Sequence, residues 1–302
     1  WNPDAPLAQE VIDRMDSGTG IHATADAKFR PLANKDNDYL ISRDDQRNKG
    51  YSGIKGIGEK SATKFSSDGL TVQGKRFNAS AWARAQAKAQ GADIVVTPEL
   101  SLVGYPPEDL LLRPSLNIRI EQALQSLADI ENIVLVLGYP KLIDGQLFNV
   151  AGVWLNGVCL GEYAKQKLPN YQVFDEKRYF SAGKHGFSFS YKDQKIALAV
   201  CEDIWHDEVA IQAKAAHADL LLVLNASPFH INKQAQRLSM VQQRAQQHQL
   251  PIAYLNLVGG QDELVFDGGS FMVNDDGQIA AEAPLFTEQL IVVDFDKQFT
   301  VQ

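Results

Sequence analysis

The 302-residue sequence predicts an α/β protein in which a mixed sheet lies under helices. Two observations support this class. Short apolar runs alternate with helical patterns through the middle of the chain, which is typical of parallel strands joined by helices. Hairpin patterns, such as the apolar runs on either side of Asn156-Gly157, stand earlier and later in the chain. They indicate that antiparallel pairs belong to the same fold.

Composition narrows the class of protein further. The chain carries 29 basic and 37 acidic residues, a net charge of −8, which argues against nucleic-acid binding by bulk electrostatics. Its longest apolar run, around Leu220–Leu224, is too short to cross a bilayer, and no basic-then-apolar leader opens the sequence. The two cysteines, Cys159 and Cys201, form neither a disulfide framework nor a zinc-binding spacing. We therefore expect a cytoplasmic protein without a membrane partner.

Residues 1–72 differ in composition from the rest of the chain. They are rich in Asp, Lys, Asn, Gly and Ser and show no sustained hydrophobic period. Gly53–Lys64 resembles the hairpin of a helix-hairpin-helix element, whose glycines could offer backbone N–H groups to a phosphate, although a surface turn explains it equally well. We predict two parts, an N-terminal segment of unclear origin at 1–72 and the main domain at 73–302.

The first half of the main domain should contain three strand regions and two helices. An Ala-rich helix over about 77–90 should end at Gly91, a residue that favours helix C-termini. The hairpin strands are assigned because apolar runs flank a two-residue turn. The remaining elements are expected, in order, at 94–96 (strand), 118–130 (helix), 133–137 (strand), 150–155 and 158–163 (hairpin).

The second half is organised around KIALAVCEDIWHDE, residues 195–208. Its apolar run Ile196–Val200 predicts a buried strand that ends directly at Cys201. A helix starting there would favour a thiolate, and acidic neighbours are costly to bury without a reason. Cys201 is therefore a candidate nucleophile, although a cysteine after an apolar strand can also be a core residue. A helix is expected after Cys201 and should run to about 216. Further elements are expected at about 220–224 (strand), 232–249 (helix), 252–257 (strand) and in closing strands around a turn at 274–277.

Three reactive side chains follow three different predicted strands: Glu99, Lys165 and Cys201. If these strands lie side by side, their ends converge on one pocket. A carboxylate beside a lysine can take the proton of the thiol, and the lysine can stabilise the oxyanion of a tetrahedral intermediate. The three together predict acyl transfer from an amide. Singly, Glu99 could be a cap or a surface acid, and Lys165 a solvated loop residue.

A Cys–His pair is the competing mechanism. His206 stands only five residues after Cys201 on the same expected helix start, so its ring cannot easily face the thiol. His230 follows NASPF and could line the pocket. We favour the Glu–Lys–Cys set.

The strings PELSLVGYPPEDLL, YAKQKLPNYQVFDEKRYF, CEDIW and NASPF, in this order and spacing, resemble the carbon–nitrogen hydrolase (nitrilase) superfamily. Together with NLVGGQDELVFDGGS at 256–270, they resemble more narrowly the glutaminase domain of glutamine-dependent NAD+ synthetase. The resemblance covers about 76–300 and implies a nitrilase-like four-layer α-β-β-α sandwich. Residues 1–72 match nothing in the family.

The resemblance also implies roles for individual residues. Glu99 would be the general base, Cys201 the nucleophile and Lys165 the third member of the triad, with Lys167 as the alternative lysine. The supporting residues and the glutamine-binding residues would be Glu176 (orienting the lysine and the amide), Glu202 (backbone N–H in the oxyanion hole), Tyr171, Ser227 and Lys233. Cys159 is expected in the core.

The implied activity is hydrolysis of L-glutamine through a Cys acyl-enzyme, with the ammonia used to amidate deamido-NAD+. No cofactor is expected for this domain. ATP, Mg2+ and deamido-NAD+ would serve a synthetase domain, normally in the same chain, whose SGGxDS loop is not found here. We expect a homo-oligomer, and the polar, Gly-rich loop at 258–269 is the candidate docking surface for the synthetase domain. The alternatives are an amidase of the same superfamily acting on another small amide, and a nucleic-acid-binding module based on 53–64.

Overall fold

The structure is a computed structural model that describes residues 62–66, 69–72, 75–77, 87, 90–129 and 132–295. The chain divides into two compact units, Trp1–Trp82 and Ala83–Gln302. The predicted domain boundary at 72/73 stays a prediction. Residues 53–61 of the helix-hairpin-helix-like segment lie outside the described residues, as does most of the Ala-rich helix expected at 77–90.

The described part of the first unit is a small antiparallel sheet that sequence analysis did not predict. Its strands are β1 (Ala62–Ser66), β2 (Gly69–Val72) and β3 (Lys75–Phe77), paired in that order. The last residues of the helix-hairpin-helix-like segment therefore belong to β1.

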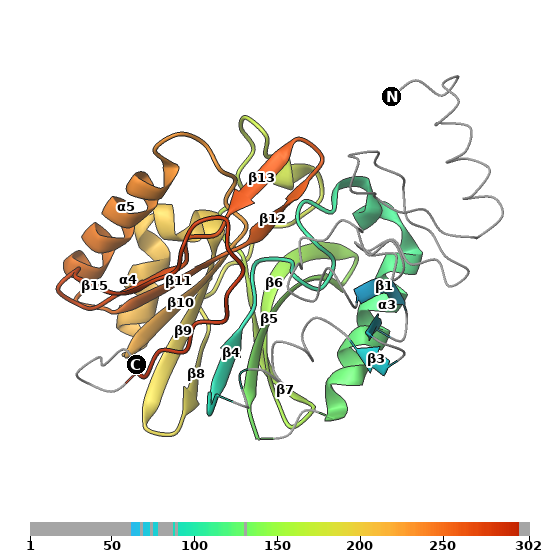
Figure 1. Cartoon of the computed structure of the whole chain (residues 1–302), viewed down its shortest axis with the longest axis horizontal. Coiled ribbons are helices and arrows are strands. Elements are labelled where there is room, and N and C mark those ends of the chain that lie inside the picture. Colours follow the sequence, from blue (N-terminus) through green and yellow to red (C-terminus); the bar gives the residue numbers. More distant parts are fainter. Residues whose placement is uncertain are drawn as a thin grey trace. The chain divides into compact units, whose positions relative to one another are not determined.

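The first sheet of the second unit has the order β4-β5-β6-β7 (Figure 1). Its strands are β4 (Ile94–Val96), β5 (Val134–Ile143), β6 (Gln146–Leu155) and β7 (Val158–Ala164). β4 and β5 are parallel, and the other pairs are antiparallel. The predicted hairpin at β6–β7 is confirmed. The strand expected at 133–137 is twice as long as predicted, because β5 continues through a second hairpin into β6.

Helix α3 (Pro114–Gln125) contacts β5 from outside, between the 3-10 turns η1 (Glu108–Leu112) and η2 (Ser126–Asp129). The predicted start at 118 was wrong by one turn. Proline is well tolerated at the first helical position, where its missing N–H has no helical partner, so the helix begins at Pro114.

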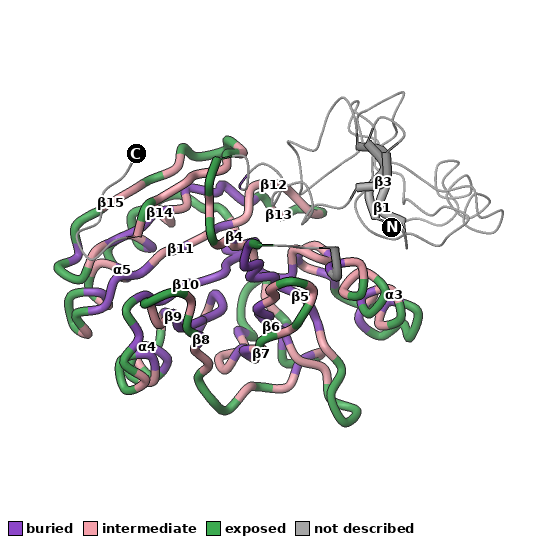
Figure 2. The backbone as a smooth tube through the Cα atoms, turned by 90° about the horizontal axis from the view of Figure 1, so that it is seen from below, coloured by how far each residue is buried: buried purple, intermediate pink, exposed green. Residues whose placement is uncertain are grey.

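The second sheet has the order β15-β14-β11-β10-β9-β8 (Figure 2). Its strands are β8 (Ser188–Tyr191), β9 (Gln194–Val200), β10 (Leu220–Asn225), β11 (Ile252–Asn256), β14 (Phe271–Val273) and β15 (Ile279–Glu282). The central strands β9, β10 and β11 are parallel, while the outer pairs are antiparallel. The mixed sheet predicted from the alternating pattern is confirmed.

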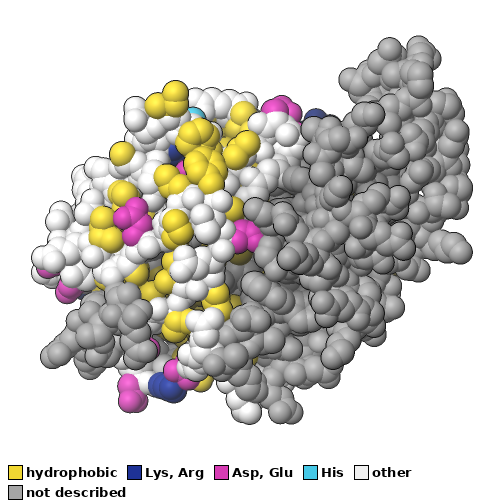
Figure 3. All heavy atoms as spheres, viewed as in Figure 1, with side chains coloured by type: hydrophobic (Ala, Val, Ile, Leu, Met, Phe, Trp, Pro, Cys, Tyr) yellow, Lys and Arg dark blue, Asp and Glu magenta, His cyan; other side chains and the backbone are white. Residues whose placement is uncertain are grey.

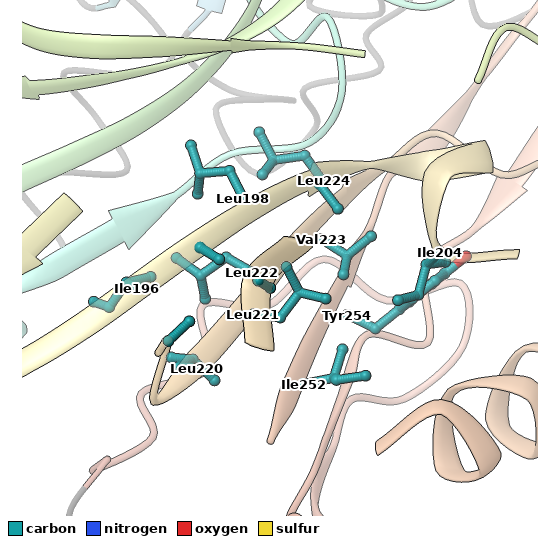
Figure 4. Close-up of a cluster of buried hydrophobic side chains, with 14 of the residues drawn as sticks. Ile196, Leu198, Ile204, Leu220, Leu221, Leu222, Val223, Leu224, Ile252 and Tyr254 are labelled. Atoms are coloured by element: carbon teal, nitrogen blue, oxygen red, sulfur yellow. The ribbon is translucent and has the colours of Figure 1, made fainter. Parts of the chain in front are cut away.

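Helices α4 (Asp207–Ala215) and α5 (Lys233–His248) lie on the outer side of this sheet, where α4 contacts β9 and α5 contacts β11 and β14 (Figure 1). Every residue of β10 is buried, and the five residues before Asn225 form one continuous apolar run. Its leucines join Ile196, Ile252 and Tyr254 in the hydrophobic core (Figure 4).

The two sheets pack face to face. Buried side chains of β5, β6 and β7 belong to the same apolar cluster as those of β9 and β10, and β6 contacts β9 directly. With α3 outside one sheet and α4 and α5 outside the other, the layers follow the expected α-β-β-α order.

The segment 258–269 is not the loop that the sequence suggested. It forms a separate two-stranded hairpin of β12 (Val258–Gln261) and β13 (Leu264–Asp267). Neither strand shows the alternation of apolar and polar residues that predicts a strand, because β12 reads Val-Gly-Gly-Gln and β13 reads Leu-Val-Phe-Asp.

Candidate active site

Cys201 lies at the carboxyl end of β9, directly after five apolar residues of the strand. Its φ is +47°, in the left-handed region that a non-glycine residue seldom adopts, and its side chain is buried. Such conformations persist only where the surrounding structure holds them, and they cluster at functional sites. The fold therefore turns the chain sharply to place this thiol.

Lys165 follows β7 and is completely buried. Its Nζ lies 2.7 Å from Glu99 Oε1 and 2.8 Å from Glu176 Oε1. Glu99 follows β4, and Glu176 begins the 3-10 turn η3 (Glu176–Arg178). A lysine ammonium thus bonds to two carboxylates inside the protein. Charged side chains are seldom buried unless they are paired in this way.

Polar groups of the neighbouring segments fix both carboxylates. Asn149 Nδ2 donates to Glu99 Oε1 at 2.7 Å, and the backbone N–H of Ala226 donates to Glu99 Oε2 at 3.1 Å. The Tyr105 hydroxyl donates to Glu176 Oε1 at 2.9 Å. Glu176 Oε2 is buried and has no hydrogen-bond partner among the described residues, so it can accept a bond from a ligand.

The electrostatics of this cluster favour a neutral thiol at rest. Burial raises the pKa of Cys201 well above its usual value, and the charge of Glu99 adds to this, while Lys165 opposes it. The expectation that a helix start favours a thiolate was wrong. Cys201–Trp205 form a 3-10 turn, η4, and the α-helix begins only at Asp207.

The pKa values of Lys165 and Glu176 depend on each other. Burial disfavours the charged form of Lys165, but the charges of Glu176 and Glu99 outweigh it and hold the lysine pKa well above its usual value. Burial raises the pKa of Glu176 to about 7, with Lys165 opposing and Glu99 adding to the rise. One cation therefore serves two carboxylates, and its charge does not cancel the effect of burial on the pKa of Glu176.

Two of the three predicted glutamine-binding side chains, Tyr171 and Lys233, contact residues of the nucleophile turn. The Tyr171 hydroxyl donates to Glu202 Oε2 at 2.8 Å, and Lys233 Nζ lies 4.3 Å from the centre of the Trp205 ring. Burial raises the pKa of Tyr171 and lowers the pKa of Lys233. Tyr171 is half exposed, so this side of the cluster faces solvent.

Ser227 lies on the segment after β10 and is buried. Its hydroxyl oxygen accepts a hydrogen bond from Arg237 Nε at 3.2 Å, and its backbone N–H donates to Asn256 Oδ1 at 2.9 Å. The serine is thus held by the core rather than by the solvent-facing groups around Cys201.

The alternatives to these residues lie elsewhere. The Lys167 ammonium pairs with Glu208 at 2.7 Å near the surface and not with Glu99 or Glu176. Cys159 is only half-buried in β7, so its expected place in the core was wrong. His206 lies 3.4 Å from Glu202 Oε1 and His230 contacts the backbone oxygen of Ile231, and both histidines are exposed.

Four residues of this region escaped sequence analysis: Tyr105, Asn149, Tyr163 and Arg237. Asp203 drew attention there only as one of the two acidic residues that follow the candidate nucleophile. A cavity of about 200 Å³ adjoins the cluster, lined by the segments around Tyr105 and around Glu176.

Two kinds of feature are absent from the part of the chain that the structure describes. Within it, no group of three His, Cys, Asp or Glu side chains is placed to hold a metal ion. None of the helices in that part has the length and apolar character needed to span a membrane.

A buried cysteine beside a lysine that two carboxylates hold, at the strand ends of an α-β-β-α sandwich, belongs to a class of hydrolases. The family model described as Carbon-nitrogen hydrolase matches residues 72–302. The chain belongs to this family, and its fold is the nitrilase fold.

The chain is similar to glutamine-dependent NAD(+) synthetases. It is 46% identical to the one from Acinetobacter baylyi over 212 residues, which are 70% of this chain and 39% of that protein. It is 43% identical to the one from Xylella fastidiosa over 208 residues, which are 68% of this chain and 38% of that protein. The chain thus spans about two fifths of the length of these curated relatives.

Solved structures agree with the fold. The glutamine-dependent NAD+ synthetase from Acinetobacter baumannii, in complex with ADP, matches with a TM-score of 0.71 and 44% identity, over 72% of this chain and 42% of that one. An amidase from Nesterenkonia, with an acetamide moiety added covalently at its active-site cysteine, matches with a TM-score of 0.61 and 29% identity, over 67% and 77%.

Proposed function

We propose that this chain is a glutamine amidohydrolase that releases ammonia from L-glutamine through an acyl-enzyme on Cys201. The observation that carries the proposal is the fully buried Lys165, bonded to Glu99 and Glu176 beside a strained, buried cysteine. The similarity to glutamine-dependent NAD+ synthetases supports glutamine as the substrate.

The first half of the reaction forms the acyl-enzyme. Because the thiol is neutral at rest, Glu99 takes its proton as the sulfur attacks the amide carbon. The oxygen of the tetrahedral intermediate is stabilised by Lys165 and by the backbone N–H of Glu202. The carbon–nitrogen bond then breaks, Glu99 gives its proton to the leaving nitrogen, and ammonia departs from a thioester.

The second half returns the enzyme to its starting state. Water attacks the thioester, Glu99 takes a proton from the water, and the sulfur leaves to regain that proton. Glutamate is the product. In the first half the free Oε2 of Glu176 would accept a hydrogen bond from the substrate amide, and in both halves its Oε1, bonded to Lys165, would keep the lysine charged.

Glutamine would bind on the solvent-facing side of Cys201. The Lys233 ammonium suits the α-carboxylate of the substrate, and Glu202 with its partner Tyr171 suits the α-ammonium group. Ser227 would contribute mainly its backbone, because its side chain is engaged by Arg237.

A second candidate is an amidase acting on another small amide, which the similarity to the Nesterenkonia amidase favours. The two candidates differ in the substrate groups that they recognise besides the amide, because a glutaminase also binds the charged α-amino and α-carboxylate groups. A glutaminase should prefer L-glutamine over propionamide and butyramide by at least a hundredfold in kcat/KM, since only glutamine carries the charged ends. An equal or reversed preference would favour the amidase.

The proposal is tested with two matched cysteine variants. Cys201→Ala should abolish glutaminase activity with the fold intact, because thiol to methyl is a small change, whereas Cys159→Ala should stay within about twofold of wild type. The measurements are ammonia release and the mass shift after reaction with a glutamine-like electrophile. Activity that survives in the Cys201 variant and is lost in the Cys159 variant would refute the assignment.

We also propose that the ammonia serves a synthetase domain that uses ATP, Mg2+ and deamido-NAD+, and that this domain docks at the β12–β13 hairpin. Hydrophobic side chains gather beside this hairpin (Figure 3). Val265, Phe229 and Phe286 are each more than two fifths exposed, and the two phenylalanine rings lie 5.3 Å apart. An exposed apolar group of this kind is typical of an interaction surface.

Docking should raise the activity of a glutaminase that is poorly aligned alone. The test is glutaminase activity of this chain with and without an added synthetase domain and its dinucleotide substrate. Full activity in isolation, unchanged by the partner, would contradict coupling and leave the Cys201 chemistry untouched.

A further inference from the structure

Asp203 is a buried carboxylate that the proposed chemistry does not use. Its side chain is fully excluded from solvent, yet it accepts four hydrogen bonds. The donors are the backbone N–H of Val200 (2.9 Å), the backbone N–H of Gln166 (3.0 Å), the backbone N–H of Lys167 (2.8 Å) and the Tyr163 hydroxyl (2.8 Å).

The positions of these donors in the chain are informative. Val200 directly precedes Cys201, while Gln166 and Lys167 directly follow Lys165. Lys165 comes from the four-stranded sheet and Cys201 from the six-stranded sheet, so no strand ladder sets the distance between them. One carboxylate therefore bonds to both turns on which that distance depends.

The charge on Asp203 is part of the arrangement. Three of the four donors are backbone N–H groups, which cannot accept, so a protonated carboxyl could direct its own hydrogen only at the Tyr163 hydroxyl. Burial raises the pKa of Asp203 to about 6, with the Val200 N–H, the charge of Lys165, the Lys167 N–H and the Tyr163 hydroxyl opposing the rise. The group is therefore ionised at neutral pH and holds its donors by charge-assisted bonds, which are stronger than neutral ones.

The strained turn at Cys201 needs such an anchor. A non-glycine residue at φ +47° costs energy that the surrounding structure must offset. The bond from the Val200 N–H to Asp203 closes this turn from inside the protein. Loss of the bond would let the turn relax and move the thiol relative to Lys165 and Glu99.

We propose that Asp203 is a positioning residue. It holds the turn at Cys201 at a fixed distance from the turn that follows Lys165, although the two turns come from different sheets. The inference rests on the proposed function, because the distance between Cys201 and Lys165 matters for activity only if both residues take part in the reaction. Asp203 touches neither substrate nor the reacting atoms, so it should affect the chemical step and not substrate binding.

Asp203→Asn is the sharpest variant because it keeps the shape and removes one acceptor. If the amide oxygen faces Gln166 and Lys167, the amide nitrogen meets the Val200 N–H, donor against donor. If the amide is flipped, its nitrogen meets the two other N–H groups. Either way at least one backbone donor near the site loses its partner, which is costly in a buried place.

Asp219→Asn is the matched control. Asp219 Oδ2 accepts the backbone N–H of Lys195 at 2.8 Å, so it too bonds to the backbone of β9, but at the opposite end of the strand and in solvent. We expect Asp203→Asn to lower kcat for glutamine at least thirtyfold with KM within threefold, and Asp219→Asn to leave both within twofold. Thermal unfolding should show both variants folded at the assay temperature.

A second readout needs no substrate. In a Cys159→Ala background only Cys201 can react with iodoacetamide, and Asp203→Asn should slow this alkylation at least fivefold, because the thiol no longer faces its base. If wild type hydrolyses no amide but alkylation still depends on Asp203, the proposed function fails while the positioning role stands. An unchanged alkylation rate and kcat in a folded variant would overturn the role.

A purely structural role would also show itself. Activity of Asp203→Asn that falls only in proportion to the folded fraction, with kcat per folded molecule unchanged, would overturn the proposal. Should that variant not fold, Tyr163→Phe removes a single neutral donor and is expected to lower kcat three- to tenfold at constant KM. No change in kcat for Tyr163→Phe would then overturn it instead.

Discussion

Lys165 Nζ lies 2.7 Å from Glu99 Oε1, and both side chains are completely excluded from solvent. The two residues stand at the ends of strands that are not neighbours in the sheet, so their contact depends on the chain segments that bring them in. Burying an ion pair costs desolvation that the pair only partly recovers. The presence of a second carboxylate, Glu176, on the same ammonium makes this a site arranged for chemistry more than for stability.

Replacing the buried lysine should affect both activity and stability. Lys165→Met removes the charge that stabilises the oxyanion, so kcat should fall at least about a hundredfold. It also leaves two buried carboxylates without their cation, at a cost on the order of 3–5 kcal/mol in the free energy of unfolding. Lys167→Met, which loses only a surface pair with Glu208, should change either quantity little. Glutaminase rates and urea unfolding of the two variants test this prediction. A larger loss in Lys167→Met than in Lys165→Met would contradict the assignment of Lys165 to the site.

The stability of the protein should depend on pH through Glu176. Its pKa is raised to about 7 in the folded state, above the usual value of 4.5. Between these values the folded state binds more protons than the unfolded state, so this group lowers the free energy of unfolding as pH rises from about 4.5 to 7. Asp203, whose pKa is raised to about 6, likewise lowers the free energy of unfolding as pH rises, but over a lower pH range.

Urea unfolding of wild type and of Glu176→Gln between pH 4.5 and 7.5 measures this contribution. The variant cannot titrate at this position, so its stability should fall less steeply with pH than that of wild type. Identical slopes would mean that the Glu176 carboxyl has an ordinary pKa in the folded protein.

Substrate recognition should depend on Lys233. Its ammonium lies over the Trp205 ring near Cys201, so Lys233→Met should raise KM for glutamine about tenfold and leave kcat within threefold. The control is Lys214→Met, because Lys214 is exposed and its ammonium bonds to the backbone oxygen of Gln249. Steady-state kinetics with glutamine test this. An unchanged KM in the Lys233 variant would remove the lysine from the binding site.

A second buried ion pair should prove structural. Arg237 Nη1 bonds both oxygens of Asp267 at 2.8 and 2.9 Å, and both residues are buried. Asp267→Leu leaves the guanidinium unpaired and should cost on the order of 3–5 kcal/mol in the free energy of unfolding. The double variant with Arg237→Met should recover part of that loss, which chemical denaturation of the three variants will show. Full additivity of the two single losses would contradict direct coupling.

The sequence by itself determined the strands and the chemical groups at their ends. The apolar run Ile196–Val200 predicts β9, and the motifs around Glu99, Lys165 and Cys201 predict which side chains follow strands. Such signals are local, because a strand pattern and the residue that ends it lie within a few positions of each other. For the same reason the family and its sandwich fold could be predicted from short strings.

Only the tertiary structure decided how the two sheets hold these groups together. Asp203 bonds to backbone groups up to 37 residues away, and Glu99 accepts the N–H of Ala226 across 127 residues. Bonds of this kind join segments far apart in the chain and leave no period in the sequence. The burial that raises the pKa values of Cys201 and Glu176 likewise exists only after the sheets have packed, because desolvation is a property of the folded interior.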